Sequence, residues 1–540
     1  GGGVPPDHQV RVRPEAADVV RPADHDVVGG EALDELVDLA GLPGTVGVGE
    51  GTIPIIKLFN QALDLDEGEF VARTKGTFKL GVHFVDWHRQ GQDYVHGFGK
   101  IGQDLGLVQF HHYWLKMWQA GKARPLDEYS INTWAARHHK FMQARTDRKN
   151  SPLADIAYAY HFDAGLYARF LREYSEARGV TRVEGKVVDV TLRSDDGHVE
   201  SITLADGRAI TGQLFVDCSG FRGLLIEQAL KTGFEDWGHW LPCDRAAAVP
   251  CASPEGPVTP YTRSTARPAG WQWRIPLQHR LGNGHVFSSA HMSEDEAVSI
   301  LMANLDGEAL AEPKVLRFAT GKRRKTWNRN VVALGLASGF VEPLESTSIH
   351  MVQSSIARLC AFFPQSGFNQ VEIDEFNAHA DFEADRIRDF LVLHYHATAR
   401  NDTPFWDYCR TMAVPETLQR KLDIFNANGR VFRDNMELFA ETSWVQVMHG
   451  QGLQPRGYHG LVDVYPEQKI HEYLESVRGV IANCVRAMPD HADFIAKVTA
   501  PAMACVLGAA QAQEVDSLRT DRYSIGSGLQ RAIDAALRTV

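Results

Sequence analysis

The chain has 540 residues, of which 44% are hydrophobic, 9% aromatic and 23% charged. This ordinary globular mixture excludes a disordered or fibrous chain, and the length allows a large buried core. Asp and Glu (68) outnumber Lys and Arg (56), so the formal net charge is −12. A net acidic chain without a basic block is a poor candidate for binding nucleic acid.

The cysteine pattern and the apolar segments bear on metal binding and location. The seven cysteines include no C-x-x-C pair, and no H-E-x-x-H motif occurs. We therefore expect no metal site and a reducing compartment. The first 20 residues lack the apolar segment of a signal peptide, and the uncharged stretch from Val498 is too short to span a bilayer. These features predict a cytoplasmic protein without membrane contact.

Residues 1–43 differ from the rest of the chain. They contain no aromatic residue, and only Glu31–Gly41 has the apolar spacing of a helix. Further on, the patterns predict strands at Thr77–Trp87, Val183–Leu192, Leu214–Cys218, Trp271–Pro276, His285–Ser289 and Val331–Leu336. They predict helices at Ala164–Ala177, Ser293–Asn304, Ser346–Phe363 and Glu383–His396. This order indicates an α/β module over residues 1–365 and a mainly helical module over residues 366–540, packed as one body.

Two loops rich in small residues are candidates for cofactor binding. The first comprises Gly47, Val48, Gly49, Glu50, Gly51, Thr52, Ile53 and Pro54. The second follows the strand at Leu214 and includes Asp217, Ser219 and Gly220. Glycine lets the backbone approach a cofactor closely, and α/β sheets bind nucleotides where strands end. A plain turn remains the alternative at both places.

A third candidate is the stretch W-Q-W-R-I-P at residues 271–276. Trp271 and Trp273 alternate along the predicted strand, so both side chains point to one face. They serve either as core or as a ligand wall, and Pro276 ends the motif.

A fourth candidate follows the apolar strand Val331–Leu336. The chain continues through Gly335, Leu336 and Ala337 into E-P-L-E-S-T-S at residues 342–348 and then into a helix. A helix N-terminus offers free N–H groups and partial positive charge, which suits a small anion. Glu345 precedes this terminus, and a solvated capping carboxylate is the alternative interpretation.

Lys79 lies in the predicted strand Thr77–Trp87. Phe78, Leu80, Val82 and Phe84 alternate along it and should face the core. Lys79 then points to the other face, where a solvated lysine is the ordinary outcome.

Together these motifs resemble the flavin-dependent halogenases of the tryptophan-halogenase family. The order matches over roughly residues 44–470: G-V-G-E-G-T-I-P, F-K in a strand, H-F-D-A, D-C-S-G-F-R-G-L-L, W-x-W-x-I-P, E-P-L-E-S-T, R-D-F and D-T-P-F-W. W-x-W-x-I-P separates these halogenases from ordinary flavin monooxygenases. The resemblance implies a flavin monooxygenase-like FAD-binding module, with a Rossmann-type mixed sheet, and an added mostly helical substrate module.

The resemblance also implies residue roles. Lys79 and Glu345 match the catalytic lysine and glutamate, and Thr347 and Ser348 match the halide site. The two glycine-rich loops and the Gly335–Ala337 segment become cofactor-binding residues. His96 and Phe98 match positions in the wall around an aromatic substrate. Phe439 and Trp444 are further wall candidates from the aromatic content of their segment, with plain packing as the alternative.

The implied reaction uses FAD as FADH₂, which a separate flavin reductase supplies. O₂ and chloride or bromide then give hypohalous acid, which Lys79 and Glu345 deliver to an electron-rich aromatic substrate, indole or tryptophan-like. Two alternatives stay open: a flavin-dependent aromatic hydroxylase, and a flavoprotein remnant that no longer binds FAD well. The oligomeric state is open, with a homodimer as one option.

Three features depart from the family pattern. Residues 1–43 show no apolar strand followed by a G-x-G-x-x-G turn, and one hypothesis is an altered reading frame or start that ends near Gly44. The halide turn reads Ser346-Thr347-Ser348 instead of S-T-G, and Ser348 tolerates a positive φ less well than glycine. The segment Asn426–Trp444 has no adjacent tyrosine pair, so indole and phenols are as compatible as free tryptophan.

Overall fold

The computed structural model describes residues 49–365 and 367–512. Its largest sheet has seven strands in the order β15-β11-β14-β13-β12-β3-β4. Their bounds are β3 Gly81–Val85, β4 Asp93–Gly97, β11 Arg245–Cys251, β12 Thr262–Arg267, β13 Gly270–Pro276, β14 Leu281–Phe287 and β15 Lys314–Arg317. β12 and β3 run parallel, and the other neighbours run antiparallel, so the sheet is mixed.

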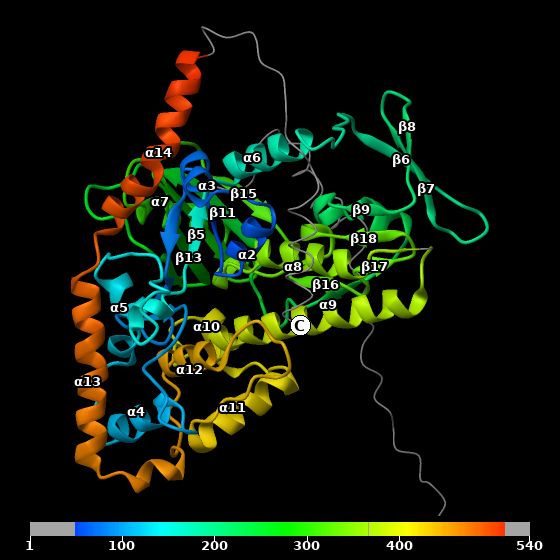
Figure 1. The fold of residues 1–540 in the computed structure, drawn as a ribbon. Helices are drawn as coiled ribbons and strands as arrows, with labels where there is room; N and C mark the ends of the chain where they lie inside the picture. The colour runs from blue at the N-terminus through cyan, green and yellow to red at the C-terminus, as the bar shows by residue number, and fades with distance from the viewer. Residues whose placement is uncertain (1–48, 366, 513–540) are drawn as a thin grey trace, which may run out of the picture.

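Four three-stranded sheets accompany the large one. The first contains β1 (Glu50–Gly51), β5 (Ala159–Phe162) and β2 (Thr77–Lys79). The second contains β17 (Trp327–Asn328), β18 (Val331–Ala333) and β9 (Phe215–Asp217). The third contains β10 (Phe234–Asp236), β16 (Gly321–Arg323) and β19 (Gly339–Phe340). The fourth, made of β6 (Val187–Leu192), β7 (Val199–Leu204) and β8 (Ala209–Thr211), projects from the body (Figure 1).

The parallel pair β9 and β18 positions two of the predicted loops. Because parallel strands end at the same edge, the segments after Asp217 and after Ala333 leave the sheet side by side. This is the edge at which open α/β sheets bind cofactors.

Helices surround the sheets. Near the sheets lie α2 (Ile56–Ala62), α3 (Glu67–Arg73), α6 (Ala164–Glu176), α7 (Glu294–Ala303) and α8 (Ser348–Ala361). The long α9 (Gln370–His396) runs beneath them, followed by α10 (Pro404–Thr411), α11 (Glu416–Asn428), α12 (Glu441–Gly450), α13 (Glu467–Arg486) and α14 (His491–Ala512). Figure 1 shows α4 (Phe110–Gln119) and α5 (Ile131–Arg137) grouped with α11, α12 and α13. The helical layer therefore draws on two separate parts of the chain.

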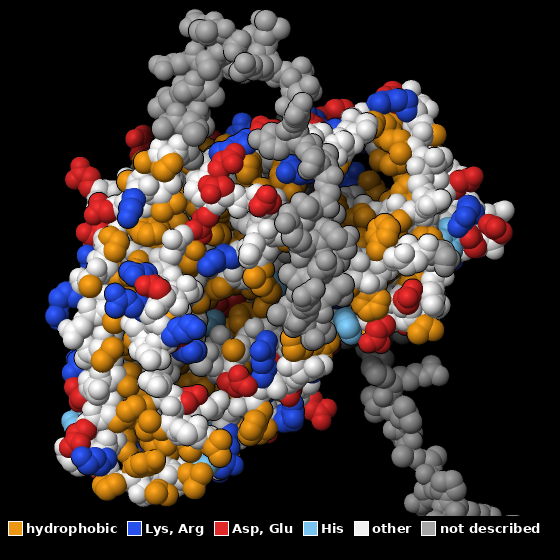
Figure 2. Space-filling model, viewed as in Figure 1, with side chains coloured by type: hydrophobic (Ala, Val, Ile, Leu, Met, Phe, Trp, Pro, Cys, Tyr) orange, Lys and Arg blue, Asp and Glu red, His pale blue; other side chains and the backbone are white. Residues whose placement is uncertain are grey.

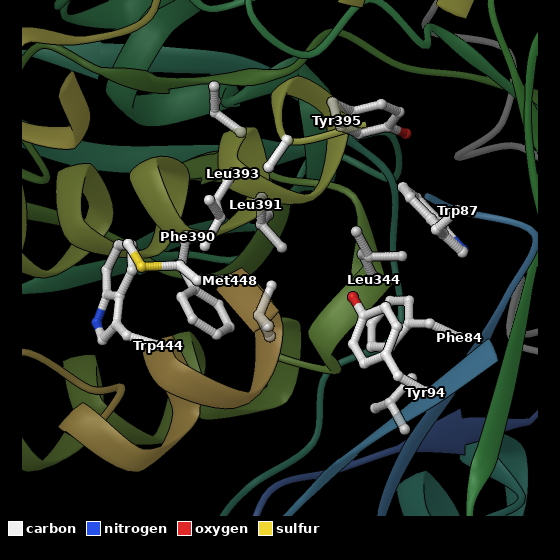
Figure 3. Close-up of a cluster of buried hydrophobic side chains, with 14 of the residues drawn as sticks. Phe84, Trp87, Tyr94, Leu344, Phe390, Leu391, Leu393, Tyr395, Trp444 and Met448 are labelled. Atoms are coloured by element: carbon white, nitrogen blue, oxygen red, sulfur yellow. The ribbon is translucent and has the colours of Figure 1, made fainter. Parts of the chain in front are cut away.

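One hydrophobic core joins the large sheet to the helical layer. Phe84, Trp87 and Tyr94, from β3, β4 and the turn between them, pack against Phe390 to Tyr395 of α9 and Trp444 of α12 (Figure 3). The amide of Gln446 on α12 also pairs with both backbone groups of Gly97, at 3.0 Å each. The expected mixed α/β fold with a helical C-terminal part is confirmed.

The predicted strand Thr77–Trp87 is broken at Leu80. Lys79 pairs with Ala159 in the β1-β5-β2 sheet, whereas Gly81 pairs with Gly97 in the large sheet. Leu80 itself belongs to neither strand: it donates its N–H to the Pro260 carbonyl, and its own carbonyl accepts a bond from the Phe98 N–H. The chain therefore passes from one sheet to another directly after Lys79. In the predicted strand Val183–Leu192, residues 183–186 lie outside β6.

Two further observations concern the surface. No helix among residues 49–365 and 367–512 is both long and apolar enough to cross a membrane. On the face shown in Figure 2, acidic and basic side chains are interspersed. The predicted helix Glu31–Gly41 and the hypothesis about residues 1–43 lie outside the described residues.

Candidate active site

A cavity of about 510 Å³ lies against one face of the large sheet. The predicted cofactor residues that line it are Gly49, Glu50, Gly51, Ser219, Gly220, Gly335 and Leu336. Trp271, Trp273 and Ile275 form a wall, and Ser346 and Ser348 complete the lining near α8. Motifs separated by almost 300 positions in the sequence therefore meet around one space.

Two glycines show why small residues surround this cavity. A Cβ on Gly51 would lie 2.7 Å from Ser346 Oγ and 3.4 Å from Lys79 Nζ. Gly335 has a φ of +61°, a backbone conformation that side chains rarely adopt. A planar flavin ring fits this site, because the site combines small residues, a flat indole wall and nearby backbone at the end of a parallel strand pair.

Several predicted cofactor residues lie behind the cavity wall. Thr52 and Ile53 are buried and Pro54 is half-buried, and Thr52 Oγ1 donates to the Tyr160 carbonyl. Asp217 is buried and accepts bonds from the backbone of Ser219, Leu225 and Ile226, so it holds the loop in shape. Ala337 is core. Gly47 and Val48 lie outside the described residues.

The W-x-W motif has a polar connection that its pattern did not predict. Trp271 and Trp273 point to the same face of β13, as expected; both line the cavity, and their rings are 6.2 Å apart. Trp271 Nε1 also donates to Glu342 at 2.8 Å, and the Tyr395 hydroxyl donates to the same carboxylate oxygen. Burial raises the pKa of Glu342 to about 7, although these two bonds lower it. Pro276 is buried at the end of β13.

The turn before α8 carries the expected halide residues. Ser346 has φ +60° and ψ 40°, so the left-handed residue is Ser346, and Ser348 already belongs to the helix. The expectation that Ser348 would have to adopt a positive φ was therefore wrong. Thr347 is fully buried, and its side chain makes no capping bond. The backbone N–H groups of Thr347 and Ser348 stand at the N-terminus of α8, where free donors favour an anion.

Lys79 is fully buried, so the alternative of a solvated lysine was wrong. Its Nζ donates to Ser346 Oγ at 2.8 Å and lies 5.5 Å from the centre of the Phe98 ring. The break at Leu80 explains the error, because the alternation across residues 77–85 does not describe one continuous sheet. Burial lowers the pKa of Lys79 to about 7, although the charge of Glu345 opposes this shift.

Glu345 is also buried, with 1% of its surface exposed, so it is not a solvated cap. His96 Nδ1 lies 2.9 Å from one carboxylate oxygen, and His394 Nε2 lies 2.9 Å from the same oxygen. Burial alone would raise the pKa of Glu345, but the two histidines outweigh it and hold the pKa at about 2. Glu345 is therefore an anion clamped by two imidazoles.

His394 has acceptors at both ring nitrogens. Its Nδ1 lies 2.8 Å from the Phe390 carbonyl, and its Nε2 faces Glu345. Both ring nitrogens of His394 therefore face hydrogen-bond acceptors, and these two contacts fix the orientation of the ring beside Glu345.

Three of the four predicted substrate-wall residues surround one aromatic side chain, Phe390, whereas Phe98 belongs to another hydrophobic cluster and lies beside Lys79. Phe439 stacks on Phe390 at 3.8 Å, Trp444 meets Phe390 edge-on at 4.9 Å, and the His96 ring is 5.6 Å from Phe390. Figure 3 shows Phe390 beside Trp444 and Met448. The His96 Nε2 and Trp444 Nε1 atoms are buried without a hydrogen-bond partner among the described residues.

Several residues of the site were not singled out from the sequence. Ser346, His161 and Phe390 stood inside quoted motifs, and His394 follows Phe390 by one helical turn. His161 is buried, and its nitrogens lie 3.0 Å from the hydroxyls of Thr77 and Thr262. Burial and the nearby Lys79 hold the pKa of His161 well below its usual value. The available sequence signal for His394 was its spacing of one helical turn from Phe390, but this spacing does not identify Glu345 as its partner.

Known proteins resemble this chain over most of its length. A family model described as tryptophan halogenase matches residues 35–467. BrvH, a flavin-dependent halogenase from Brevundimonas sp. BAL3, is 47% identical with a TM-score of 0.82, covering 84% of this chain and 92% of its own. Xcc4156, a flavin-dependent halogenase from Xanthomonas campestris, is 45% identical with a TM-score of 0.82, covering 84% and 91%. Tryptophan 6-halogenase SttH from Streptomyces toxytricini is 36% identical over 420 residues, which cover 73% of this chain and 79% of SttH.

The fold, shared with solved flavin-dependent halogenases, places the chain in the class of flavin-dependent oxidoreductases. Within that class, the chain belongs to the tryptophan halogenase family. The cavity of about 510 Å³ is called the flavin-sized cavity below.

Proposed function

We propose that this enzyme halogenates an electron-rich aromatic compound of the indole class, with Lys79 and Glu345 as the catalytic pair. One observation carries the proposal: a buried lysine of lowered pKa bonds to the cavity residue Ser346 and also lies beside the aromatic side chain of Phe98. A hydroxylase has no evident use for such an amine.

The cavity residues would hold FAD against the wall of Trp271 and Trp273. Bound as FADH₂, the cofactor would supply the electrons with which O₂ and chloride or bromide give hypohalous acid. The N–H groups of Thr347 and Ser348 would hold the halide at the N-terminus of α8. A separate flavin reductase is the partner that this reaction requires.

Lys79 receives the oxidant. Near neutral pH much of its amine is uncharged and nucleophilic, because burial has lowered the pKa to about 7. Ser346 fixes the amine in place, and the packed surroundings keep water from the reactive halogen. Position, not intrinsic halogen reactivity, then selects the ring carbon.

Glu345 would stabilise positive charge. A carboxylate whose pKa is about 2 is a weak base, so polarisation of the halogen donor fits it better than uptake of the ring proton. A fixed carboxylate in a dry site stabilises the positive charge that develops on the attacked ring.

The surroundings of Lys79 and Phe390 support an aromatic substrate of the indole class. Phe439 and Trp444 offer ring contacts around Phe390, and Phe98 lies beside Lys79. Lys421 lies over the Trp444 ring at 4.9 Å but is bonded to Glu437 at 2.9 Å. These two charges neutralise each other and are not available to the ammonium and carboxylate of free tryptophan. SttH is named a tryptophan halogenase, whereas the names of BrvH and Xcc4156 state no substrate.

A coupled assay tests the proposal. Purified protein is incubated with FAD, a flavin reductase, NADH, air and bromide, with indole and tryptophan as parallel substrates. Mass spectrometry should show a bromine isotope doublet on indole that Lys79→Ala abolishes while flavin binding persists. The exposed Lys100 is the control, and Lys100→Ala should retain the product. Product from Lys79→Ala would refute its role. A bromide-independent hydroxylated product would favour the hydroxylase, and absent flavin binding would favour the remnant.

A further inference from the structure

A second cavity of about 240 Å³ lies on the opposite face of the large sheet. It is lined by Arg263, Thr265, Arg267, Gln272, Arg274, Asn283, Asn304, Leu305 and Asp306. Gln272 and Arg274 alternate with Trp271 and Trp273 along β13, so the strand separates this space from the flavin-sized cavity. We call it the arginine pocket. Nothing in the proposed reaction uses it.

The sheet register places like charges next to each other in the arginine pocket. Arg263 on β12 is the direct cross-strand partner of Arg274 on β13, and Arg274 is in turn the partner of Asn283 on β14. Like charges directly opposite each other on one face of a sheet are destabilising. Arg267 lies on the same face of β12, four residues after Arg263, with Thr265 between them. The register therefore brings the charges of Arg263 and Arg274 closest together.

The described residues neutralise only part of this charge. Arg274 Nε pairs with Asp306 at 2.6 Å. Arg267 donates twice to the uncharged Gln272 Oε1, at 3.0 and 2.7 Å. Asp86 attracts Arg267 from outside the pocket lining, whereas Arg263 repels it. Among the residues that line the pocket, three arginines therefore stand against a single carboxylate, that of Asp306.

Three buried polar atoms in the arginine pocket have no hydrogen-bond partner among the described residues: the donors Arg263 Nε and Arg274 Nε and the acceptor Asn283 Oδ1. Arg274 Nε still has the ion pair with Asp306, so Arg263 Nε and Asn283 Oδ1 are the two atoms left without either kind of contact. The amide nitrogen of Asn283 is already bonded to Cys251 Sγ at 3.1 Å. A buried donor and acceptor left unpaired are costly, so a ligand that satisfies both would have to accept one bond and donate another.

We propose that the arginine pocket binds a phosphate group. Hydrogen phosphate carries negative charge for the arginines, several acceptor oxygens for their N–H groups and one hydroxyl donor for Asn283. Arginine guanidinium groups match phosphate oxygens in geometry and in charge. A carboxylate offers the charge and the acceptors but lacks the donor. This proposal does not depend on the halogenation reaction.

Titration calorimetry with inorganic phosphate tests the site. The protein is first saturated with FAD, so that the place of the cofactor's own phosphates is filled. We expect one saturable phosphate site, weakened at least tenfold by Arg263→Gln. The control is Arg208→Gln, an exposed arginine on the β7-β8 turn paired with Asp206, which should leave the affinity unchanged. No binding, or equal binding by both variants, would overturn the proposal.

Thermal unfolding gives an independent test, because Arg263→Gln should raise the Tm but abolish its further rise with phosphate. Without phosphate, Arg263→Gln should raise the Tm, because it relieves the repulsion from Arg274 and Arg267. Added phosphate should raise the Tm of the wild-type protein and of Arg208→Gln but not of Arg263→Gln. A phosphate-dependent rise of equal size in all three proteins would show unspecific salt action and refute the site.

Two further titrations identify the source of the phosphate group. Acetate at the same ionic strength should bind at least tenfold more weakly than inorganic phosphate, because it lacks the donor. Equal binding of acetate would overturn the assignment of phosphate. Glycerol phosphate distinguishes a phosphate monoester from free phosphate: tighter binding assigns the pocket to an ester, and weaker binding assigns it to the free ion.

Discussion

The amine of Lys79 donates a 2.8 Å hydrogen bond to the hydroxyl of Ser346, 267 positions later in the chain. The bond joins strand β2 to the turn that precedes α8, and Ser346 also lines the flavin-sized cavity. In the proposed reaction, a buried amine so close to the cavity would carry the oxidant from the cofactor to the substrate.

The pH profile of halogenation should report the amine of Lys79. Because its pKa is about 7, we expect the bromination rate to rise about tenfold per pH unit below neutrality and to level off above pH 7. Initial rates at saturating FADH₂ and indole measure this. A rate that does not change across pH 7 would contradict a role for the uncharged amine.

Stability should also depend on pH through Lys79. Its pKa in the folded protein, about 7, lies below the ordinary value of 10.5, so between these values the unfolded chain binds more protons than the folded one. Stability should therefore rise with pH across this window. The variant Lys79→Met, which cannot be protonated, should lose this part of the slope in urea unfolding experiments. Lys100→Met is the control and should keep it.

Glu345→Gln should slow bromination by about 100-fold, since it removes a fixed charge that faces the developing cation. Its second effect is more specific. Because the charge of Glu345 raises the pKa of Lys79, the residual activity should show its inflection at a lower pH than in the wild-type enzyme. Glu200→Gln, at the exposed position of strand β7, should change neither quantity. An unshifted inflection in Glu345→Gln would show that the two groups do not interact.

Ser346 allows a test that separates chemistry from backbone strain. Ser346→Ala and Ser346→Gly both remove the acceptor for Lys79, so both should lower the bromination rate to a similar degree. Only glycine relieves the positive φ of +60°, so Ser346→Gly should be more stable than Ser346→Ala by about 1 kcal/mol. Rates and urea midpoints of the pair decide this. A rate that follows stability across the two variants would assign Ser346 a structural role only.

Trp271→Phe should reduce stability by about 1–3 kcal/mol, because it removes a donor from the buried carboxylate of Glu342. The matched variant is Trp273→Phe in the same strand, which loses ring surface at the cavity but leaves Glu342 bonded. We expect a smaller loss for this control in urea unfolding. Equal losses would mean that ring packing, not the Trp271–Glu342 bond, stabilises the motif.

Local patterns predicted much of the secondary structure. The predicted helix Ala164–Ala177 corresponds to α6 at residues 164–176, and the strand Trp271–Pro276 to β13 at residues 270–276. In each of these two elements, one hydrophobic period runs from end to end because the element stays within one layer of the fold. The prediction failed at Thr77–Trp87, where the alternation continues although the strand changes sheets at Leu80. The alternation of apolar residues indicates only that side chains are buried, and the segments on both sides of Leu80 are buried.

The sequence by itself determined the class of this protein: its motifs, in order, predicted a flavin-dependent halogenase and selected Lys79 and Glu345. The tertiary structure alone decided the states of these groups. The pKa of Lys79 depends on burial between residues 51, 98 and 346, and that of Glu345 on His96 and His394. The arginine pocket likewise exists only through the cross-strand register of Arg263 and Arg274. Charge and solvation depend on distances between residues far apart in the chain, and those distances are set by packing, which no local pattern encodes.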